Sequence, residues 1–247
     1  MKFTFIADPN NPRAVRAQKE CAKRYGQETD LTITDVVIAL GGDGTLLKIL
    51  QSLLNYKIPV LGMNLGHVGH FLSHYSLNDL PDRVAQAERK EITPLQISVR
   101  NGAGKGLKQY AFNEFSFSRT TPQAARLEVT VQDQFGLFIQ REVFGDGLIV
   151  ATPMGSSGYY ASAQGIPVDP NQDVIALQSI CSKKDLSAIV SPDSLVKVKV
   201  IQERGKRPVC VDRDGQDRVA NVHSATIKQA RNKSIMLLCE RKADLAR

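Results

Sequence analysis

The 247-residue chain has no tryptophan, and aromatic residues make up only 6% of it. Its Lys and Arg residues are scattered, with no dense basic tract and no basic helix with interleaved aromatic residues, which disfavours nucleic acid as a partner. No apolar run approaches the length that spans a bilayer, and the apolar start at residues 1–7 is too short for a signal peptide. We therefore expect a cytoplasmic protein that binds neither nucleic acid nor a membrane.

Cysteines at metal-binding or redox spacing are missing as well. No Cys-x-x-Cys pair occurs, which predicts reduced and mostly buried thiols. The four cysteines are Cys21, Cys181, Cys210 and Cys239. His67, His70 and His74 cluster, but the glycines among them argue against a helix that would place them on one face. We therefore predict no metal site built from protein side chains.

The chain does carry an excess of positive charge. Lys and Arg number 32 against 25 Asp and Glu, so the formal net charge is +7. This charge suits an anionic partner such as a nucleotide or polyphosphate. A hydrophobic content of 42% is ample for a packed core, and the length allows two modest domains or one large one.

A glycine-rich loop follows the apolar run at residues 35–40. The run itself predicts a buried parallel strand. Residues 41–44 read Gly-Gly-Asp-Gly, and residues 45–54 have the leucine spacing of a helix. A strand, a glycine turn and a helix N-terminus together form an anion site. Asp43 is unusual there, because a carboxylate repels phosphate unless a metal ion lies between them or the carboxylate handles a proton. The alternative is a simple tight turn in which Asp43 caps the helix.

This loop is neither of two better-known phosphate loops, because it lacks both a Gly-Lys-Ser/Thr ending and a Gly-x-Gly-x-x-Gly pattern. Strands and helices alternate around it. We expect strands at 2–7, 35–40 and 58–62 and helices at 13–25, 45–54 and 78–89. Such alternation predicts a parallel sheet with its ligand at the carboxyl ends of the strands. A second glycine-rich loop, residues 62–69, begins at the same edge.

From residue 95 the hydrophobic period changes to two, which predicts antiparallel strands of a separate β domain. The glycines at 101–106 are interpreted as a hairpin tip, because strands flank them and no helix follows. Asn113 and Glu114 open one strand and could be an ordinary polar pair. The stretch at 145–162 sets a carboxylate between glycines, then a buried strand, then a Gly/Ser/Thr-rich turn with an aromatic residue. That order suits ribose hydroxyls and a stacked base.

The Gly-Gly-Asp-Gly-Thr sequence at 41–45 resembles the signature shared by NAD kinases, by diacylglycerol and sphingosine kinase-like lipid kinases and, more loosely, by phosphofructokinases. The stretch at 145–162 resembles the NAD kinase segment Asp-Gly-Leu, Thr-Pro-Thr-Gly-Ser-Thr-Ala-Tyr and Ser, which lipid kinases lack. The Asn64 loop, the Asn113-Glu114 pair and Asp214-Gly-Gln resemble NAD kinase motifs in the same order. The chain is thus identified as a divergent member of that family.

The resemblance implies Mg²⁺-dependent transfer of the γ-phosphoryl group of ATP, or of polyphosphate, to the 2′-hydroxyl of the adenosine ribose of NAD. It also implies an NAD kinase-like fold. We expect an α/β domain with a parallel sheet at residues 1–93, completed by about 234–247, and an all-β antiparallel domain at 94–233. The first domain would bind the phosphate donor and the second the dinucleotide. A last strand at 234–239 would return to the first domain, and the tail at 241–247 would fray.

The resemblance assigns catalysis to Asp43, which would orient the 2′-hydroxyl and take its proton. Backbone N–H groups of the glycines beside it would reach phosphates, and Tyr159 would lie against a ring face. The residues implied to bind the nucleotides are Gly41, Gly42, Gly44, Thr45, Asn64, Gly66, His70, Phe71, Asn113, Glu114, Asp146, Thr152, Ser157, Gly158, Tyr159 and Ser162.

Several places depart from the family pattern, among them Gly158, where the family commonly has Ala, and residues 164–168, where the order of a family segment is disturbed. NAD kinases usually place Phe directly after the last glycine of the Asn64 loop, whereas this chain has His70 and then Phe71. Met154 replaces a hydroxyl residue, and residues 176–181 lack the family's prolines and histidine. The alternatives are a catalytically weak NAD(P)-binding regulatory protein and a lipid kinase-like enzyme. The family usually assembles through its β domain, so a homodimer or homotetramer is expected.

Overall fold

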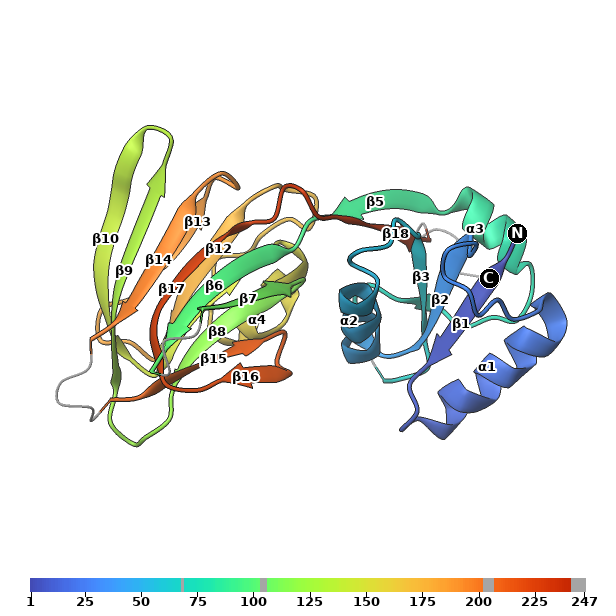
Figure 1. The fold of residues 1–247 in the computed structure, drawn as a ribbon, viewed down its shortest axis with the longest axis horizontal. Coiled ribbons are helices and arrows are strands. Elements are labelled where there is room, and N and C mark those ends of the chain that lie inside the picture. The colour runs from blue at the N-terminus through green and yellow to red at the C-terminus, as the bar shows by residue number, and fades with distance from the viewer. Residues whose placement is uncertain (68, 103–105, 202–206, 241–247) are drawn as a thin grey trace. The chain divides into compact units, whose positions relative to one another are not determined.

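The computed structural model describes residues 1–67, 69–102, 106–201 and 207–240 (Figure 1). The chain divides into two compact units, Met1–Thr93 with Asn232–Arg247, and Pro94–Arg231. The tail at 241–247 and part of the predicted hairpin tip at 101–106 lie outside the described residues.

The first unit contains a sheet in the order β1-β2-β3-β18-β5, with β4 beside β3. Its strands from β1 to β18 pair in parallel, and β5 runs antiparallel to β18. The α/β fold with a parallel sheet is therefore confirmed. The elements are β1 (Phe3–Ala7), α1 (Pro12–Tyr25), β2 (Val36–Gly41), α2 (Asp43–Ser52), β3 (Val60–Asn64), β4 (Ser73–His74), α3 (Leu80–Gln86), β5 (Glu88–Ile92) and β18 (Ile235–Cys239).

Local sequence explains where these elements begin and end. The Asn11 side chain caps α1 by accepting the first backbone N–H groups of the helix, Pro12 follows at the first helical position, and Gly26 ends it at φ 78°. All six residues of β2 are buried, as a central parallel strand requires. Helix α2 begins at Asp43, two residues earlier than its leucine spacing predicts.

The prediction of a helix over 78–89 is confirmed for residues 80–86 and wrong at its C-terminal end. Helix α3 ends at Gln86, and Glu88–Ile92 form β5, which pairs with β18. The Glu, Arg and Lys residues of this segment favour a helix, but the open edge of β18 offers backbone hydrogen bonds that the local sequence does not reveal. A partner about 145 positions away along the chain, Ile235 opposite Ile92, thus decides the structure here.

The second unit holds two six-stranded antiparallel sheets. Their orders are β10-β9-β14-β17-β6-β7 and β13-β12-β11-β8-β15-β16 (Figure 1). The strands are β6 (Leu95–Asn101), β7 (Gly106–Ala111), β8 (Glu114–Arg119), β9 (Ala125–Asp133), β10 (Gly136–Gly145), β11 (Gly147–Ala151), β12 (Ile175–Ile180), β13 (Ser187–Val190), β14 (Leu195–Val200), β15 (Val209–Arg213), β16 (Asp217–Val219) and β17 (Val222–Gln229). Two short helices, η1 (Met154–Ser157) and α4 (Tyr159–Ser162), follow β11.

Both sheets contribute to one hydrophobic core. Phe115 and Phe117 of β8 pack with Leu127 and Val129 of β9, and all four side chains are fully buried. The alternating burial along β9 matches the period of two in the sequence. The predicted antiparallel β fold is confirmed.

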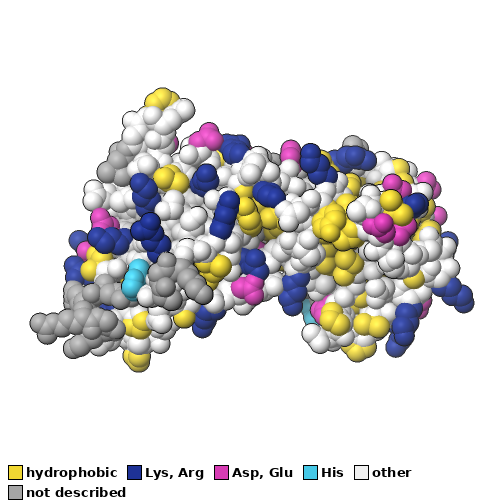
Figure 2. Space-filling view, viewed as in Figure 1, with side chains coloured by type: hydrophobic (Ala, Val, Ile, Leu, Met, Phe, Trp, Pro, Cys, Tyr) yellow, Lys and Arg dark blue, Asp and Glu magenta, His cyan; other side chains and the backbone are white. Residues whose placement is uncertain are grey.

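The surface agrees with a dispersed charge. Figure 2 shows Lys and Arg side chains spread across the face in view, interleaved with polar and apolar groups. No helix among the described residues is long and apolar enough to cross a membrane. All four cysteines are free; Cys21 and Cys210 are buried as expected, whereas Cys181 is exposed.

We expect Phe117→Ala to lower the free energy of unfolding by about 3–5 kcal/mol, because it empties a fully buried position between the two sheets. Urea unfolding followed by circular dichroism measures this. The control is Phe135→Ala, since Phe135 is 89% exposed in the turn between β9 and β10. That variant should lie within about 0.5 kcal/mol of the wild type. Equal losses in both variants would contradict the assigned core.

Candidate functional site

The first part of the candidate site is the turn between β2 and α2. Gly42 precedes the helix in an extended conformation, and the first N–H groups of α2 have no partner within the helix. A Cβ atom on Gly41 would lie 2.6 Å from the Thr45 hydroxyl oxygen, so only glycine leaves room for that side chain. The turn therefore presents N–H donors and the positive end of the helix dipole at the sheet edge.

Hydrogen bonds tie the neighbouring strand ends to this turn. The Thr45 hydroxyl donates to Asp8 Oδ2 over 3.1 Å, and Asp8 directly follows β1. The Leu65 N–H donates to the Gly41 carbonyl over 2.9 Å, and the Gly66 N–H donates to Asn64 Oδ1 over 2.9 Å. The two glycine-rich loops therefore meet.

The two oxygens of the Asp43 carboxylate have different surroundings. Oδ2 accepts the backbone N–H of His70 over 3.0 Å, and the His70 Nδ1 atom lies 3.4 Å from the same oxygen. Oδ1 is buried and has no hydrogen-bond partner among the described residues. His70 therefore hydrogen-bonds to Asp43, and the next residue, Phe71, is half-buried. One carboxylate oxygen is held in place, and the other keeps its full acceptor capacity.

The second part of the site lies in the β unit, where Asn113 and Glu114 lead into β8. The Asp214 carboxylate accepts the N–H groups of Phe112, Asn113 and Glu114 over 3.0, 2.7 and 3.1 Å. Asp214 lies in the turn between β15 and β16 and is 7% exposed. The resemblance of Asp214-Gly-Gln to a family motif draws attention to this residue in the sequence, but it does not indicate what the residue does.

Glu114 is 5% exposed, and its Oε2 atom is buried without a hydrogen-bond partner among the described residues. Burial, and next the charge of Asp214, raises the pKa of Glu114 to about 7. Asn113 Oδ1 is likewise buried and unpartnered within the described chain. A buried polar atom without a protein partner is costly, and a water molecule, an ion or a ligand can supply the partner.

The glycine-rich turn after β11 packs directly on this pair. The Thr152 hydroxyl donates to the Phe112 carbonyl over 2.5 Å and accepts the Gly155 N–H over 3.1 Å. A Cβ atom on Gly155 would lie 2.3 Å from the Asn113 carbonyl oxygen, so another residue cannot approach as closely. A Cβ atom on Gly158 would lie 3.9 Å from Asn113 Nδ2 and from Glu114 Oε2, which places the turn beside both side chains.

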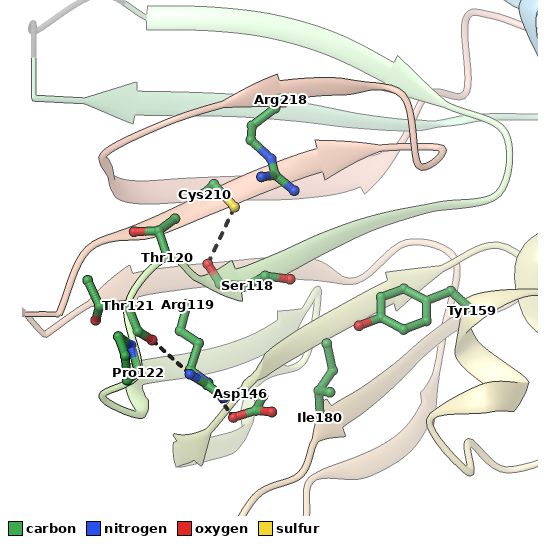
Figure 3. A pocket seen from close by; sticks show the side chains of 10 residues that line it. All are labelled: Ser118, Arg119, Thr120, Thr121, Pro122, Asp146, Tyr159, Ile180, Cys210 and Arg218. Carbon is green, nitrogen blue, oxygen red and sulfur yellow. Dashed lines mark hydrogen bonds and ion pairs between the residues drawn. The ribbon is translucent and has the colours of Figure 1, made fainter.

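Tyr159 starts α4 and lines two cavities. One measures about 500 Å³ and includes Asp146, Arg119 and Arg218 in its wall (Figure 3). Figure 3 shows the Tyr159 hydroxyl directed into it. The other measures about 370 Å³ and includes Ser162. An exposed aromatic ring between two polar cavities offers a face for a planar group.

Asp146 forms an ion pair with Arg119. Its Oδ1 atom accepts from Arg119 Nε over 2.5 Å, and Arg119 also donates to the Thr121 carbonyl over 2.8 Å (Figure 3). No motif in the sequence signals Arg119, because its pairing with Asp146 depends on β8 lying beside β11. Both side chains are partly exposed, so they remain available to a ligand.

The remaining candidate residues fall around these groups. Ser157 is exposed at the end of η1, and the Ser162 hydroxyl donates to the Gly158 carbonyl over 3.4 Å. Met154, which replaces a hydroxyl residue of the family pattern, is buried. Each unit thus brings its own predicted residues together: the glycine loops with Asp43 and His70 in the first, and the Asn113 to Ser162 set in the second.

Comparison with known families covers both units. The profile of the ATP-NAD kinase N-terminal domain matches residues 4–92, and that of the ATP-NAD kinase C-terminal domain matches residues 117–234. A curated NAD kinase of Cereibacter sphaeroides is 38% identical over 92% of this chain and 88% of its own length. One from Brucella melitensis is 32% identical over 98% of this chain and 94% of its own.

Two solved structures share the fold. Yeast NADH kinase complexed with NADH superposes with a TM-score of 0.83 at 19% identity, covering 99% of this chain and 84% of its own. An NAD kinase from Archaeoglobus fulgidus in complex with ATP superposes with a TM-score of 0.74 at 24% identity, covering 98% of this chain and 94% of its own.

The raised pKa of Glu114 predicts a pH-dependent stability. Between its ordinary value of 4.5 and about 7, the folded protein retains a proton that the unfolded chain releases, so the free energy of unfolding falls as pH rises through this window. Relative to wild type, Glu114→Gln should therefore gain on the order of 3 kcal/mol across the window. Urea titrations at several pH values test this, with Glu128→Gln on the partly exposed face of β9 as control. A pH-independent difference between Glu114→Gln and wild type would contradict the assigned pKa.

Proposed function

The chain belongs to the NAD kinase family, and we propose that it transfers the γ-phosphoryl group of ATP to the 2′-hydroxyl of the adenosine ribose of NAD, with Asp43 receiving the hydroxyl proton. The observation that carries the assignment of Asp43 is its asymmetric carboxylate at the N-terminus of α2. One oxygen is held by His70, and the other is a buried acceptor without a partner among the described residues. A hydroxyl group of the substrate supplies the missing donor.

The turn before α2 binds the donor phosphates in this proposal. The Asp43 and Gly44 N–H groups precede the first hydrogen bonds of α2, in which Thr45 and Leu46 donate to the Gly42 carbonyl. These two N–H groups and the helix dipole favour an anion. Gly42 and Gly44 would each have open space around a Cβ atom, so a phosphate can approach the backbone there. Thr45 is held away from this face by its hydrogen bond to Asp8.

The reaction is an in-line displacement at the γ-phosphorus. The ribose O2′ forms a bond to phosphorus, the bond from phosphorus to the β,γ-bridging oxygen breaks, and ADP leaves with that electron pair. The hydroxyl proton passes to Asp43, which releases it to solvent after transfer. Because such a transition state needs little covalent help, most of the acceleration comes from alignment and charge neutralisation.

Mg²⁺ fits this site as an ion carried by the donor. It prefers oxygen ligands and commonly binds through substrate phosphates plus one or two carboxylates. Among the described residues no group of three or more His, Cys, Asp or Glu side chains converges on a point. We therefore assign no protein ligand to Mg²⁺. When bound to the donor phosphates, the ion would neutralise charge that develops during transfer.

The β unit holds NAD in this proposal. Asn113 Oδ1 and Glu114 Oε2 have no partner among the described residues, and both side chains lie beside Gly158, which suits ribose hydroxyls and the adenine edge. Tyr159 supplies a ring face. Thr152 supports the turn, because its hydroxyl donates to the Phe112 carbonyl and accepts the Gly155 N–H. The paired Asp146 and Arg119 offer both signs of charge in the larger cavity.

We also propose a subunit assembly and a cellular location. Exposed apolar side chains of the β unit, among them Leu107, Phe138 and Ile189, support a homodimer or homotetramer formed through it. Four free cysteines support a cytoplasmic location. Polyphosphate remains an alternative donor, since the α2 turn recognises phosphate and makes no contact that requires adenine.

The test is NADP⁺ formation from NAD⁺, ATP and Mg²⁺, read through an NADP-specific dehydrogenase, with polyphosphate replacing ATP in a parallel reaction. Asp43→Asn should lower kcat by about 10²–10⁴-fold, because it removes the proton acceptor and keeps the shape. Asp82→Asn is the matched control, as Asp82 is an exposed acid in the first turn of α3.

Wild-type turnover in Asp43→Asn would overturn the assigned role. Binding of NAD⁺ by calorimetry without turnover in the wild-type protein would instead indicate a regulatory protein. Phosphorylation of diacylglycerol in vesicles, with none of NAD⁺, would indicate a lipid kinase.

We further expect His70→Phe to lower kcat by about 2–10-fold, because it removes the ring contact to Asp43 while the backbone N–H still holds Oδ2. Steady-state rates at saturating substrates measure the effect. His67→Phe, at an exposed histidine of the same loop, serves as the control. If both variants lose activity equally, the His70 ring does not support Asp43.

A further inference from the structure

The turn between β15 and β16 sends one carboxylate to the loop that enters β8. Asp214 is 100 positions or more away in sequence from the residues it binds, yet it accepts three consecutive backbone N–H groups, those of Phe112, Asn113 and Glu114. In return, the Asp214 N–H donates to the Glu114 carbonyl over 3.0 Å. Four hydrogen bonds thus join the two segments.

Two residues of this turn have left-handed backbone conformations, which direct the Asp214 carboxylate toward the loop. Asp214 has a φ of 49° and Gly215 a φ of 65°, both in the left-handed region. Asp tolerates this region better than most residues, and glycine adopts it freely. A carboxylate is also the side chain best suited to several converging N–H groups, since charge-assisted hydrogen bonds are about twice as strong as neutral ones.

Because all three bonds go to the backbone, they hold the loop and leave its side chains free. Asn113 Oδ1 and Glu114 Oε2 remain buried without partners among the described residues, and both side chains lie beside Gly158. A loop held in this way presents its polar groups before the ligand arrives, which reduces the ordering cost of binding.

Asp214 also acts on Glu114 through its charge. The carboxylate raises the pKa of Glu114 in addition to burial, so near neutral pH Glu114 can donate as well as accept a hydrogen bond. The other ionisable groups near this pair are Tyr159 on α4, whose pKa Glu114 helps to raise, and Arg213, which is adjacent to Asp214.

We propose that Asp214 is a positioning residue for the dinucleotide: it holds the backbone of Phe112–Glu114 so that the Asn113 and Glu114 side chains face the ligand beside Gly158. This inference rests on the proposed function, in which Asn113 and Glu114 contact NAD. Asp214 itself does not touch the reacting atoms.

The test compares Asp214→Asn with Asp217→Asn, which makes the same chemical change in an exposed residue of the same hairpin, paired with Arg213. Asp214→Asn should raise the KM for NAD about tenfold, the effect of about 1.4 kcal/mol, and leave the KM for ATP unchanged. It should also move the inflection of kcat/KM for NAD from near pH 7 to lower pH. Asp217→Asn should match the wild type.

Asp214→Glu keeps the negative charge but shifts the carboxylate by one methylene group. This variant tests the positioning role if Asp214→Asn does not fold. It should raise the KM for NAD while the inflection stays above that of an ordinary glutamate. An equal rise in the KM for both substrates, or a lower melting temperature with unchanged kinetics, would overturn the positioning role. Absence of NADP⁺ formation by the wild type would instead reject the proposed function.

Discussion

Burial of a charged carboxylate costs free energy unless N–H groups or cations replace the water around it. This constraint explains how the buried acidic residues of this protein differ. Asp214 receives three backbone N–H groups, and one oxygen of Asp43 receives another. Glu114 has a buried oxygen without a partner within the described chain, and its pKa rises to about 7. The number of N–H donors therefore separates Asp214, which holds the structure, from Glu114, which we propose binds the ligand.

Close approach of backbone to backbone is the second requirement. Gly155 lies against the Asn113 carbonyl, and Gly66 lies near Gly42, where a Cβ atom would stand 3.6 Å from the Gly42 Cα. In both units a glycine brings two loops together at the ends of strands. The loops are then held by hydrogen bonds such as those of Thr152 and Asn64.

Much of the fold follows from periodicity. The buried run before Gly41 predicts a parallel strand, and the alternation after residue 95 predicts antiparallel strands; both are confirmed. The helix prediction fails at Glu88 and Arg89, which begin β5 because β18 supplies a partner strand. Local preference also gives no indication that Arg119 pairs with Asp146, since the pair exists only when β8 and β11 are neighbours.

The sequence by itself determined the family, the order of the motifs and the alternation of strands and helices, because these depend on residues close together along the chain. Only the tertiary structure decided that His70 contacts Asp43 and that Asp214 holds the Asn113-Glu114 loop. These contacts join segments 27 and about 100 positions apart, and their geometry depends on sheet pairing and on left-handed turns rather than on local preference. Burial, which changes the chemistry of Glu114, is likewise a property of the packed fold and not of any single motif.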